Sequence, residues 1–296
     1  MNFKYYADLY LKLGRIDWKF STFCKNEGIV NNRLSYFFGQ EINHIKPSAV
    51  RSWLSDINDV GPKSKKNYLN CLNGIFNLAL QDEIIDKNPV IHIKKLIYTA
   101  PRIEPFTNTE VVRILEEAKK YPFKFRLFIA IGFFTGMRTG EIIALKNTDV
   151  DMTNRIIRIN ATRSRFGESS PKTIKSVRSV PILNILHDLL KVKFEKYQNF
   201  TYEYLLETQY GEPYRDCNVF LDTCWRPILK DLGIGYRRPY TMRHTYATNM
   251  LRRNLITPLE LAALMGHSNA KMIYDVYVNY VNANLQEFKR DIEVYN

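Results

Sequence analysis

The sequence lacks any apolar run long enough to cross a lipid bilayer. Its longest run extends from Leu127 to Phe134, with Gly132 included. A membrane-spanning helix needs roughly 18–20 apolar residues, so this run falls well short. The amino terminus, MNFKYYADLYLK, also lacks the apolar segment of a secretion signal. We therefore expect a cytoplasmic protein with no membrane partner.

Cysteine and histidine are scarce and are not spaced as metal ligands. The sequence contains no CxxC pair, which argues against a disulfide framework and a structural zinc site. A phosphate-binding loop of the GxxxxGK[ST] type is also missing, so an NTP-driven enzyme is not indicated. We expect no metal and no cofactor. The residues concerned are Cys24, Cys71, Cys217, Cys224, His44, His92, His187, His244 and His267.

Acidic residues are outnumbered by basic ones. The 296 residues include 43 Lys and Arg against 30 Asp and Glu, which gives a net charge of +13 and a pI near 9.4. Because 45% of the residues are hydrophobic, the chain can form folded domains, and disorder is not expected. A folded basic protein is a candidate for binding nucleic acid. A basic protein without such a partner remains the alternative.

The chain is predicted to form two domains, at residues 1–95 and 107–296, joined by a linker at 96–106. In the first domain, apolar residues at helical spacing predict helices over residues 47–57 and 63–85. The second helix opens with Lys63, Lys65 and Lys66, which are either a solvated face or phosphate contacts. Residues 86–106 hold three prolines and little periodicity, as is typical of an interdomain linker.

The second domain is predicted to mix helices with a small sheet. Thr107 and Glu110 have the spacing of a capping box at a helix start. A strongly apolar helix through residues 125–134 follows. Residues 155–162 and 176–182 favour strands, separated by a polar loop over residues 163–175, and the chain is helical again from Ile182. The fold class is therefore mainly α, with a β-hairpin or three-stranded sheet.

The sequence contains four short motifs, and each of them alone is compatible with an ordinary structural role. TGMRTGE places Arg138 at a glycine-flanked helix junction, and PKTIKSVRSVPI places Lys172 in a basic loop. YTMRHT holds Arg243 and His244 on a predicted helix. LMGHSNAKMIYDVY joins His267 to tyrosines near the carboxyl terminus. Taken singly, these are typical of surface arginines, solvated loops and packed tyrosines.

The four motifs in this order resemble the tyrosine recombinase (phage integrase) family. The resemblance covers about residues 103–285, and residues 1–95 look like the helical core-binding domain of that family. It implies a helical domain and an α+β catalytic domain that bind double-stranded DNA. The implied function is that of a site-specific DNA recombinase, an integrase of a phage or other mobile element. It would cut and rejoin DNA through a 3′-phosphotyrosyl intermediate, without metal or ATP.

The residue types suit this chemistry. Arginine is permanently charged and binds phosphate in bidentate fashion, so Arg138 and Arg243 would hold the scissile phosphate and stabilise its transition state. By resemblance, Lys172 is the general acid for the leaving 5′-oxygen, with Lys175 as a close rival. His267 is a further phosphate donor. Glu141 occupies the place of an acidic residue that supports the first arginine, or else is a carboxylate on the helix surface.

By resemblance, Tyr277 is the nucleophile. The family usually has nine or ten positions between the histidine of the glycine-histidine motif and the tyrosine. Tyr277 follows His267 by ten positions, whereas Tyr274 and Tyr280 follow it by seven and thirteen. A phosphotyrosyl bond conserves the energy of the broken phosphodiester, so religation requires no ATP.

Two features depart from the family pattern. Tyr240 stands where the family usually has His or Lys, three residues before the second arginine. A phenol can donate a hydrogen bond to phosphate but, with a pKa near 10, is no base at neutral pH. We interpret His244 as structural. The small arm-binding domain of many phage integrases is also not recognised; either the chain is a two-domain recombinase or that domain is missing.

DNA contacts and assembly are also predicted. A set of basic residues is expected to contact DNA. An apolar stripe after Tyr277 either packs on a neighbouring subunit in a DNA-bound homotetramer or docks on its own domain. A directionality factor is a further candidate partner, and association with the nucleoid would follow from DNA binding. The DNA-contacting set is Lys63, Lys65, Lys66, Arg163, Arg165 and Lys175, and the stripe is Leu285, Phe288, Ile292 and Tyr295.

Other functions stay open from the sequence. An Xer-type resolvase of chromosome dimers is the main alternative in biological role. A non-catalytic DNA-binding regulator on the same scaffold is supported only by Tyr240. A type IB topoisomerase shares the chemistry but not strand exchange, and a metal-dependent nuclease is disfavoured.

Overall fold

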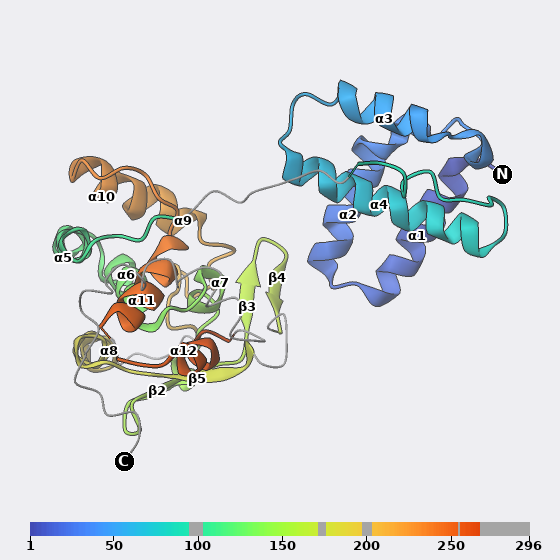
Figure 1. The fold of residues 1–296 in the computed structure, drawn as a ribbon. Helices are drawn as coiled ribbons and strands as arrows, with labels where there is room; N and C mark the ends of the chain where they lie inside the picture. Colours follow the sequence, from blue (N-terminus) through green and yellow to red (C-terminus); the bar gives the residue numbers. More distant parts are fainter. Residues whose placement is uncertain (95–102, 171–175, 197–202, 254, 267–296) are drawn as a thin grey trace, which may run out of the picture. The chain divides into compact units, whose positions relative to one another are not determined.

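The chain forms two compact units, Met1–Pro101 and Arg102–Asn296. The computed structural model describes residues 1–94, 103–170, 176–196, 203–253 and 255–266 (Figure 1). Each unit has a hydrophobic core of its own.

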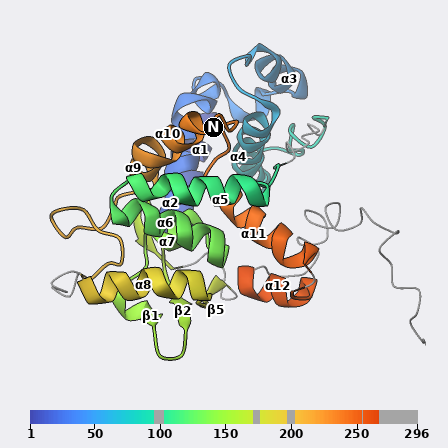
Figure 2. The ribbon, with the colours of Figure 1, turned by 90° about the vertical axis from the view of Figure 1, so that its left-hand side faces the viewer.

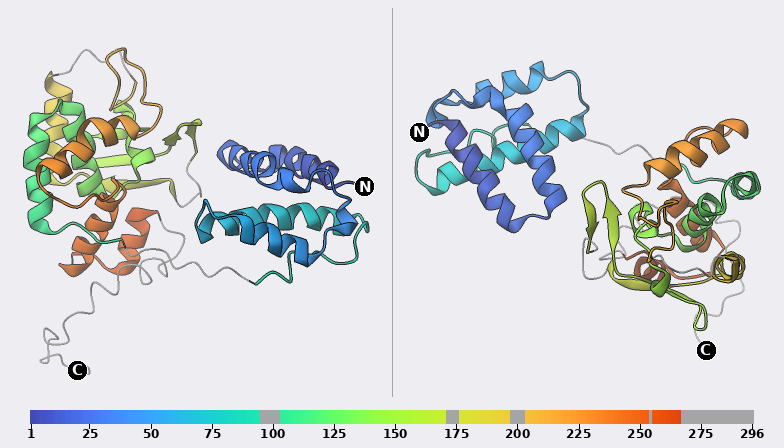
Figure 3. Two further views of the ribbon diagram at one scale, coloured as in Figure 1. Left: turned by 90° about the horizontal axis from the view of Figure 1, so that it is seen from above. Right: turned by 180° about the vertical axis from the view of Figure 1, so that it is seen from behind.

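The first unit is a bundle of four helices. They are α1 (Phe3–Asp17), α2 (Phe20–Asn32), α3 (Pro47–Asp56) and α4 (Pro62–Gln81), with short 3₁₀ turns η1 (Leu34–Phe37) and η2 (Ile42–His44) between α2 and α3. Figure 3 shows α1 and α2 in one layer and α3 and α4 in another. Aromatic rings fill the space between the helices. Phe3 lies 5.5 Å from Phe37 and 5.7 Å from Phe76, and Phe37 lies 5.3 Å from Trp53, all between ring centroids.

Both helices predicted in this unit are present, but one is shorter than expected. The predicted helix 47–57 matches α3 to within one residue. The prediction 63–85 is wrong at its end, because α4 stops at Gln81. Glu83 adopts a left-handed conformation with φ of 57°, and the Ile84 amide donates to the Ala79 carbonyl. A helix end is usually marked in the sequence by glycine in this left-handed conformation. Because glutamate takes that place here, the sequence did not indicate where α4 ends.

The first residues of the proline-containing stretch 86–106 belong to the first unit. The linker at 96–106 stays a prediction. Asn88 is fully buried, and its Nδ2 donates to the Asn73 and Asn77 side-chain oxygens at 2.9 and 2.6 Å. Its own Oδ1 accepts from the Val90 amide at 2.9 Å. Ile85 and Val90 are buried on either side. This segment is therefore fixed to α4 rather than free of it.

The second unit contains eight helices within the described residues. They are α5 (Asn108–Glu117), α6 (Phe123–Thr135), α7 (Thr139–Ile142), α8 (Asn184–Lys196), α9 (Asn218–Phe220), α10 (Arg226–Asp231), α11 (Thr241–Arg252) and α12 (Pro258–Met265). A short 3₁₀ turn follows α5, η3 (Ala118–Lys120), and another precedes the sheet, η4 (Asn147–Asp149). A π-helical turn joins α9 to α10, η6 (Leu221–Trp225).

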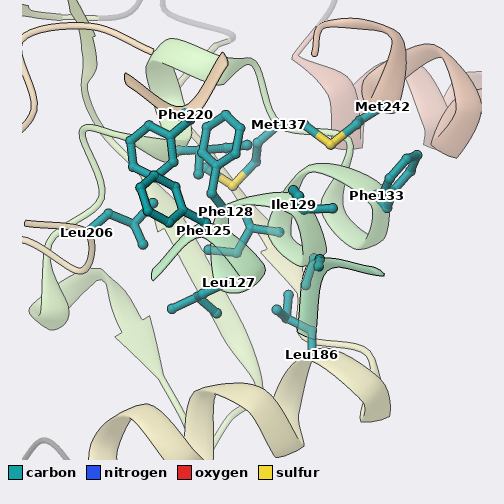
Figure 4. Close-up of a cluster of buried hydrophobic side chains, with 14 of the residues drawn as sticks. Phe125, Leu127, Phe128, Ile129, Phe133, Met137, Leu186, Leu206, Phe220 and Met242 are labelled. Atoms are coloured by element: carbon teal, nitrogen blue, oxygen red, sulfur yellow. The ribbon is translucent and has the colours of Figure 1, made fainter. Parts of the chain in front are cut away.

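Helix α6 is the centre of the second core (Figure 4). Nearly all of its side chains from Leu127 onward are buried, as expected for a helix that is apolar all round. Figure 2 shows α5 beside α6, with α8 next to the three-stranded sheet. Gly132 brings α11 close to α6, because a Cβ at this glycine would lie 2.5 Å from the Met242 methyl carbon. The helix that precedes the first arginine motif is thus held rigidly by the core.

The second unit begins slightly earlier than predicted. Phe106 is buried against Phe133 and Trp225, and its amide donates to the Thr245 hydroxyl at 3.0 Å. The predicted capping box of Thr107 and Glu110 is confirmed at the start of α5.

The β structure is larger than predicted. Strands β1 (Val150–Asp151), β2 (Ile156–Ile159) and β5 (Arg178–Pro181) form an antiparallel sheet in the order β1-β2-β5, with Ile157 opposite Val180. The expected polar loop over residues 163–175 instead contains part of a separate hairpin, β3 (Thr162–Ser164) and β4 (Gly167–Ser169), which projects from the second unit (Figure 1). Its strands are short and polar, so no apolar alternation announces them. Residues 203–217 are not helical, contrary to the prediction.

We predict that Asn88→Ala destabilises the first unit by about 1–3 kcal/mol, because it leaves the buried Val90 amide without its acceptor. Urea unfolding of the whole chain measures the effect. Asn70→Ala is the matched control, since Asn70 is exposed on the same helix as the partners of Asn88. Equal stability of the Asn88→Ala and Asn70→Ala proteins would contradict the role given to Asn88.

Candidate active site

Arg138 sits at a sharp change of direction between α6 and α7. Helix α6 ends at Gly136, which is left-handed with φ of 64°. A Cβ at this position would lie 2.5 Å from the Tyr246 ring, so both conformation and packing call for glycine. Met137 is buried and anchors the turn. The side chain of Arg138, the residue before α7, remains 34% exposed, which lets it meet a ligand.

Glu141 lies inside the protein and contacts two arginines. Its side chain is 2% exposed. Oε2 accepts from the Arg138 backbone amide at 2.8 Å, and Oε1 accepts from Arg138 Nη1 at 2.7 Å. Burial would raise the pKa of Glu141, but the hydrogen bonds and charges of Arg178, with those of Arg138, hold the pKa below its usual range. Glu141 is therefore an ionised internal carboxylate.

Arg243 on α11 is almost completely buried, with 1% exposure. Its Nη1 donates to the Gly136 carbonyl at 2.7 Å and its Nη2 to the Met265 carbonyl at 2.6 Å. The first bond fixes the turn that carries Arg138, and the second fixes the end of α12. Burial, with repulsion from Arg138, lowers the pKa of Arg243 to about 10, so the side chain stays charged at neutral pH.

Arg178 on β5 is a site residue that the sequence interpretation missed. Its Nη1 and Nη2 donate to Glu141 Oε1 and Oε2 at 3.1 and 2.9 Å, and its Nε donates to the Leu264 carbonyl at 2.6 Å. The side chain is 6% exposed. One signal was available, because Arg178 is two residues before Val180 and so shares the buried face of the strand. An arginine on such a face needs an acidic partner or hydrogen-bond acceptors inside the protein.

Tyr240 and His244 lie next to each other at the start of α11. Their ring centroids are 5.1 Å apart with an interplanar angle of 74°, an edge contact. Tyr240 is 40% exposed, whereas His244 is 8% exposed. Burial, together with the charge of Arg243, lowers the pKa of His244 to about 4. His244 is therefore neutral at physiological pH.

The predicted DNA contacts differ in how far other groups already engage them. Lys63 and Lys66 are exposed on α4. Lys65 is half-buried, and its Nζ donates to the Leu54 carbonyl at 3.2 Å. Arg163 Nη1 lies 3.3 Å from Glu168 Oε2, and its guanidinium stacks on the Tyr204 ring. Arg165 is exposed at the hairpin tip.

The structure thus brings together Arg138, Glu141, Tyr240, Arg243 and His244 in the second unit. The following predicted residues lie outside the described residues: Lys172, Lys175, His267, Tyr274, Tyr277, Tyr280, Leu285, Phe288, Ile292 and Tyr295.

No group of three His, Cys, Asp or Glu side chains among the described residues is placed to hold a metal ion. No helix in that part of the chain is long and apolar enough to cross a membrane.

Comparison with known proteins decides the family. Residues 104–283 match the phage integrase family, and residues 2–72 match the N-terminal SAM-like domain of phage integrases. The chain is 30% identical to a tyrosine recombinase XerC-like protein of Caldanaerobacter subterraneus subsp. tengcongensis, over 90% of this chain and 76% of that one. The chain belongs to the phage integrase family of tyrosine recombinases.

Two other comparisons agree. The ICEBs1 integrase of Bacillus subtilis is 25% identical over 94% of this chain and 78% of its own length. The Tn1549 transposon integrase, solved in complex with transposon right end DNA, has a TM-score of 0.78 at 23% identity, covering 94% of this chain and 95% of that one. The family resemblance and the predicted fold class, a helical domain with an α+β catalytic domain, are confirmed. The enzyme class is that of the tyrosine-type site-specific recombinases.

We predict that His244 makes the stability of the second unit depend on pH. The pKa is near 6.5 in the unfolded chain and about 4 in the folded one, so between these values the unfolded chain binds the extra proton. The contribution of His244 is therefore complete above pH 6.5 and is lost as pH falls toward 4.

Urea unfolding between pH 4 and 8 tests this. The difference in unfolding free energy between the wild-type and His244→Gln proteins should shrink as pH falls through that window. A difference that stays constant would show that His244 does not carry the pH dependence.

Proposed function

We propose that this recombinase cuts and rejoins DNA through a 3′-phosphotyrosyl intermediate formed by Tyr277, without metal or ATP. The observation that supports this most strongly is the convergence of Arg138 and Arg243 on one turn. Arg243 binds the Gly136 carbonyl, two residues before Arg138. Burial lowers the pKa of Arg243, and repulsion from the charge of Arg138 lowers it further, so the two guanidinium groups repel each other. A phosphate between them would relieve this repulsion.

The proposed role of the arginines follows from their charge and geometry. Guanidinium groups donate two parallel hydrogen bonds to phosphate oxygens. Arg138 and Arg243 would neutralise the non-bridging oxygens and stabilise the pentacoordinate transition state, in which negative charge increases. Because both are anchored before DNA binds, little reorganisation would accompany the reaction. Tyr240, which is 40% exposed beside them, is proposed to donate a further hydrogen bond to the phosphate.

The bond changes balance without a cofactor. The Tyr277 oxygen would give up its proton to solvent water and attack phosphorus, while the bond to the 5′-oxygen breaks. Lys172 would protonate the leaving 5′-oxygen, and His267 would hydrogen-bond the phosphate. Attack by a 5′-hydroxyl of a partner strand would then reverse these steps and release Tyr277. His267 directly follows Gly266, the left-handed residue that ends α12, whose neighbour Met265 binds Arg243.

We expect Tyr277→Phe to abolish a covalent protein–DNA adduct, because a phenyl ring has no oxygen to attack phosphorus. The protein is incubated in EDTA with DNA that flanks its own gene, and the adduct is detected after denaturation. Tyr274→Phe and Tyr280→Phe are the matched controls and should still form it. An adduct that survives in Tyr277→Phe but is lost in a control would reassign the nucleophile. Tight DNA binding with no adduct in any protein would favour a non-catalytic regulator.

DNA binding by the first unit is proposed to involve Lys63 and Lys66, which are exposed at the start of α4. Each phosphate contact releases counterions and adds about 0.9 to the slope of log K against log salt. Lys63→Ala/Lys66→Ala should therefore reduce the slope by about 2. Lys12→Ala/Lys87→Ala is the control, since it removes the same charge from other exposed positions. Equal slopes for the two double variants would reject these contacts.

We propose integration and excision of a mobile element as the biological role, because the ICEBs1 and Tn1549 relatives are integrases. The XerC-like relative supports the second candidate, resolution of chromosome dimers. Assembly as a homotetramer through the carboxyl-terminal tail, a directionality factor and nucleoid association are further parts of the proposal. Recombination between the element's own ends, compared with recombination of a chromosomal dimer site, separates the two roles.

A further inference from the structure

Glu141 carries one negative charge but contacts two arginines. Arg178 donates to both carboxylate oxygens, at 3.1 and 2.9 Å. Arg138 reaches one of them through its side chain, at 2.7 Å, and the other through its backbone amide. The two guanidinium groups therefore compete for the same carboxylate.

The two arginines differ in how far their side chains are exposed to solvent and to a ligand. Arg178 is 6% exposed at its side chain, whereas Arg138 is 34% exposed. A guanidinium whose charge is cancelled by a carboxylate binds phosphate weakly. Because Arg178 shares both oxygens of Glu141 with Arg138, the single negative charge of Glu141 does not cancel the charge of Arg138 alone, and the exposed Arg138 keeps charge for a ligand.

Arg178 also joins segments that are distant in sequence. Its Nε donates to the Leu264 carbonyl in α12, and its Nη1 donates to the Ser176 carbonyl at 3.1 Å. A Cβ on Gly266 would lie 3.1 Å from Nη1, so the end of α12 packs directly on this guanidinium. Residue 267 follows this end of α12, and Ser176 follows the segment that contains Lys172.

We propose that Arg178 is a positioning residue for strand cleavage: it holds the charge of Glu141 so that Arg138 stays available to the scissile phosphate, and it fixes the ends of β5 and α12 beside that site. The inference rests on the proposed function, since it assigns Arg138 to the phosphate. Lysine cannot replace Arg178 fully, because an ammonium group lacks the planar fork that binds both carboxylate oxygens and a carbonyl together.

The test measures the rate of covalent adduct formation at saturating DNA, the Kd for the same DNA, and the melting temperature. Arg178→Gln should form the adduct about ten- to a hundredfold more slowly. Losses of this size are typical when a residue that orients functional side chains, as around metal sites, is replaced. Its Kd should change less than about threefold, because most phosphate contacts lie elsewhere. Arg178→Lys should fall between it and the wild type.

A second substitution separates charge from packing. Glu141→Gln removes the charge that Arg178 holds, so Arg178→Gln/Glu141→Gln should be faster than Arg178→Gln at saturating DNA. Arg237→Gln is the matched control. Arg237 makes a bidentate ion pair with Glu110, at 2.9 and 3.0 Å, in the same unit. It should lower the melting temperature without changing the cleavage rate.

The outcomes are distinct. An Arg178→Gln rate within twofold of the wild type would overturn the inference. So would a double variant no faster than Arg178→Gln, since Arg178 would then act through packing alone. If Arg178→Gln does not fold, Arg178→Lys decides: a rate several-fold below the wild type with unchanged Kd supports the inference, and an equal rate overturns it. Absence of adduct in the wild type would instead reject the proposed function.

Discussion

An ionised carboxylate inside a protein needs compensating charge, and the catalytic unit depends on how Glu141 meets this need. Its side chain is 2% exposed, and the guanidinium groups of Arg138 and Arg178 surround it. These contacts join α7 to β5, two elements that are separated along the chain. Arg178 extends the connection to α12 through the Leu264 carbonyl. Removing one partner of such a cluster leaves a buried charge uncompensated, which costs about 3–5 kcal/mol. The cluster therefore holds the three segments in one arrangement.

Arg243 completes this frame in a different way, because carbonyl oxygens bind it. The bonds to Gly136 and Met265 orient the guanidinium without cancelling its charge. Both carbonyls are available because a left-handed glycine interrupts the helix at or just after each of them, at Gly136 and Gly266. The turn at Gly136, which frees a carbonyl for Arg243, also sets the direction of the next residues, toward Arg138. Backbone conformation and the placement of charge are thus coupled at this turn.

Local signals in the sequence predicted what is local in the structure. Helix α3, helix α6 and the capping box at Thr107 follow from periodicity and cap residues within a few positions. The order of four motifs was sufficient for the family. The end of α4 and the β3–β4 hairpin were missed because a left-handed glutamate and short polar strands carry no such signal. Arg178 was missed because its partner lies 37 positions away. The carbonyl anchors of Arg243 depend on tertiary packing, which no single-sequence pattern encodes.

The charge at the site has a consequence for catalysis. Among the described residues of the site, Arg138, Arg178 and Arg243 carry three positive charges against the single negative charge of Glu141, which leaves a surplus of two. A phosphodiester carries one negative charge, and the pentacoordinate species formed by an attacking phenolate carries two. If Arg138 and Arg243 bind the scissile phosphate as proposed, a fixed surplus of two positive charges would match the transition state better than the bound substrate. Only interactions that strengthen on reaching the transition state accelerate the chemical step. Because Glu141 and the two carbonyls fix the arginines beforehand, that surplus would need little reorganisation as charge develops on the phosphate.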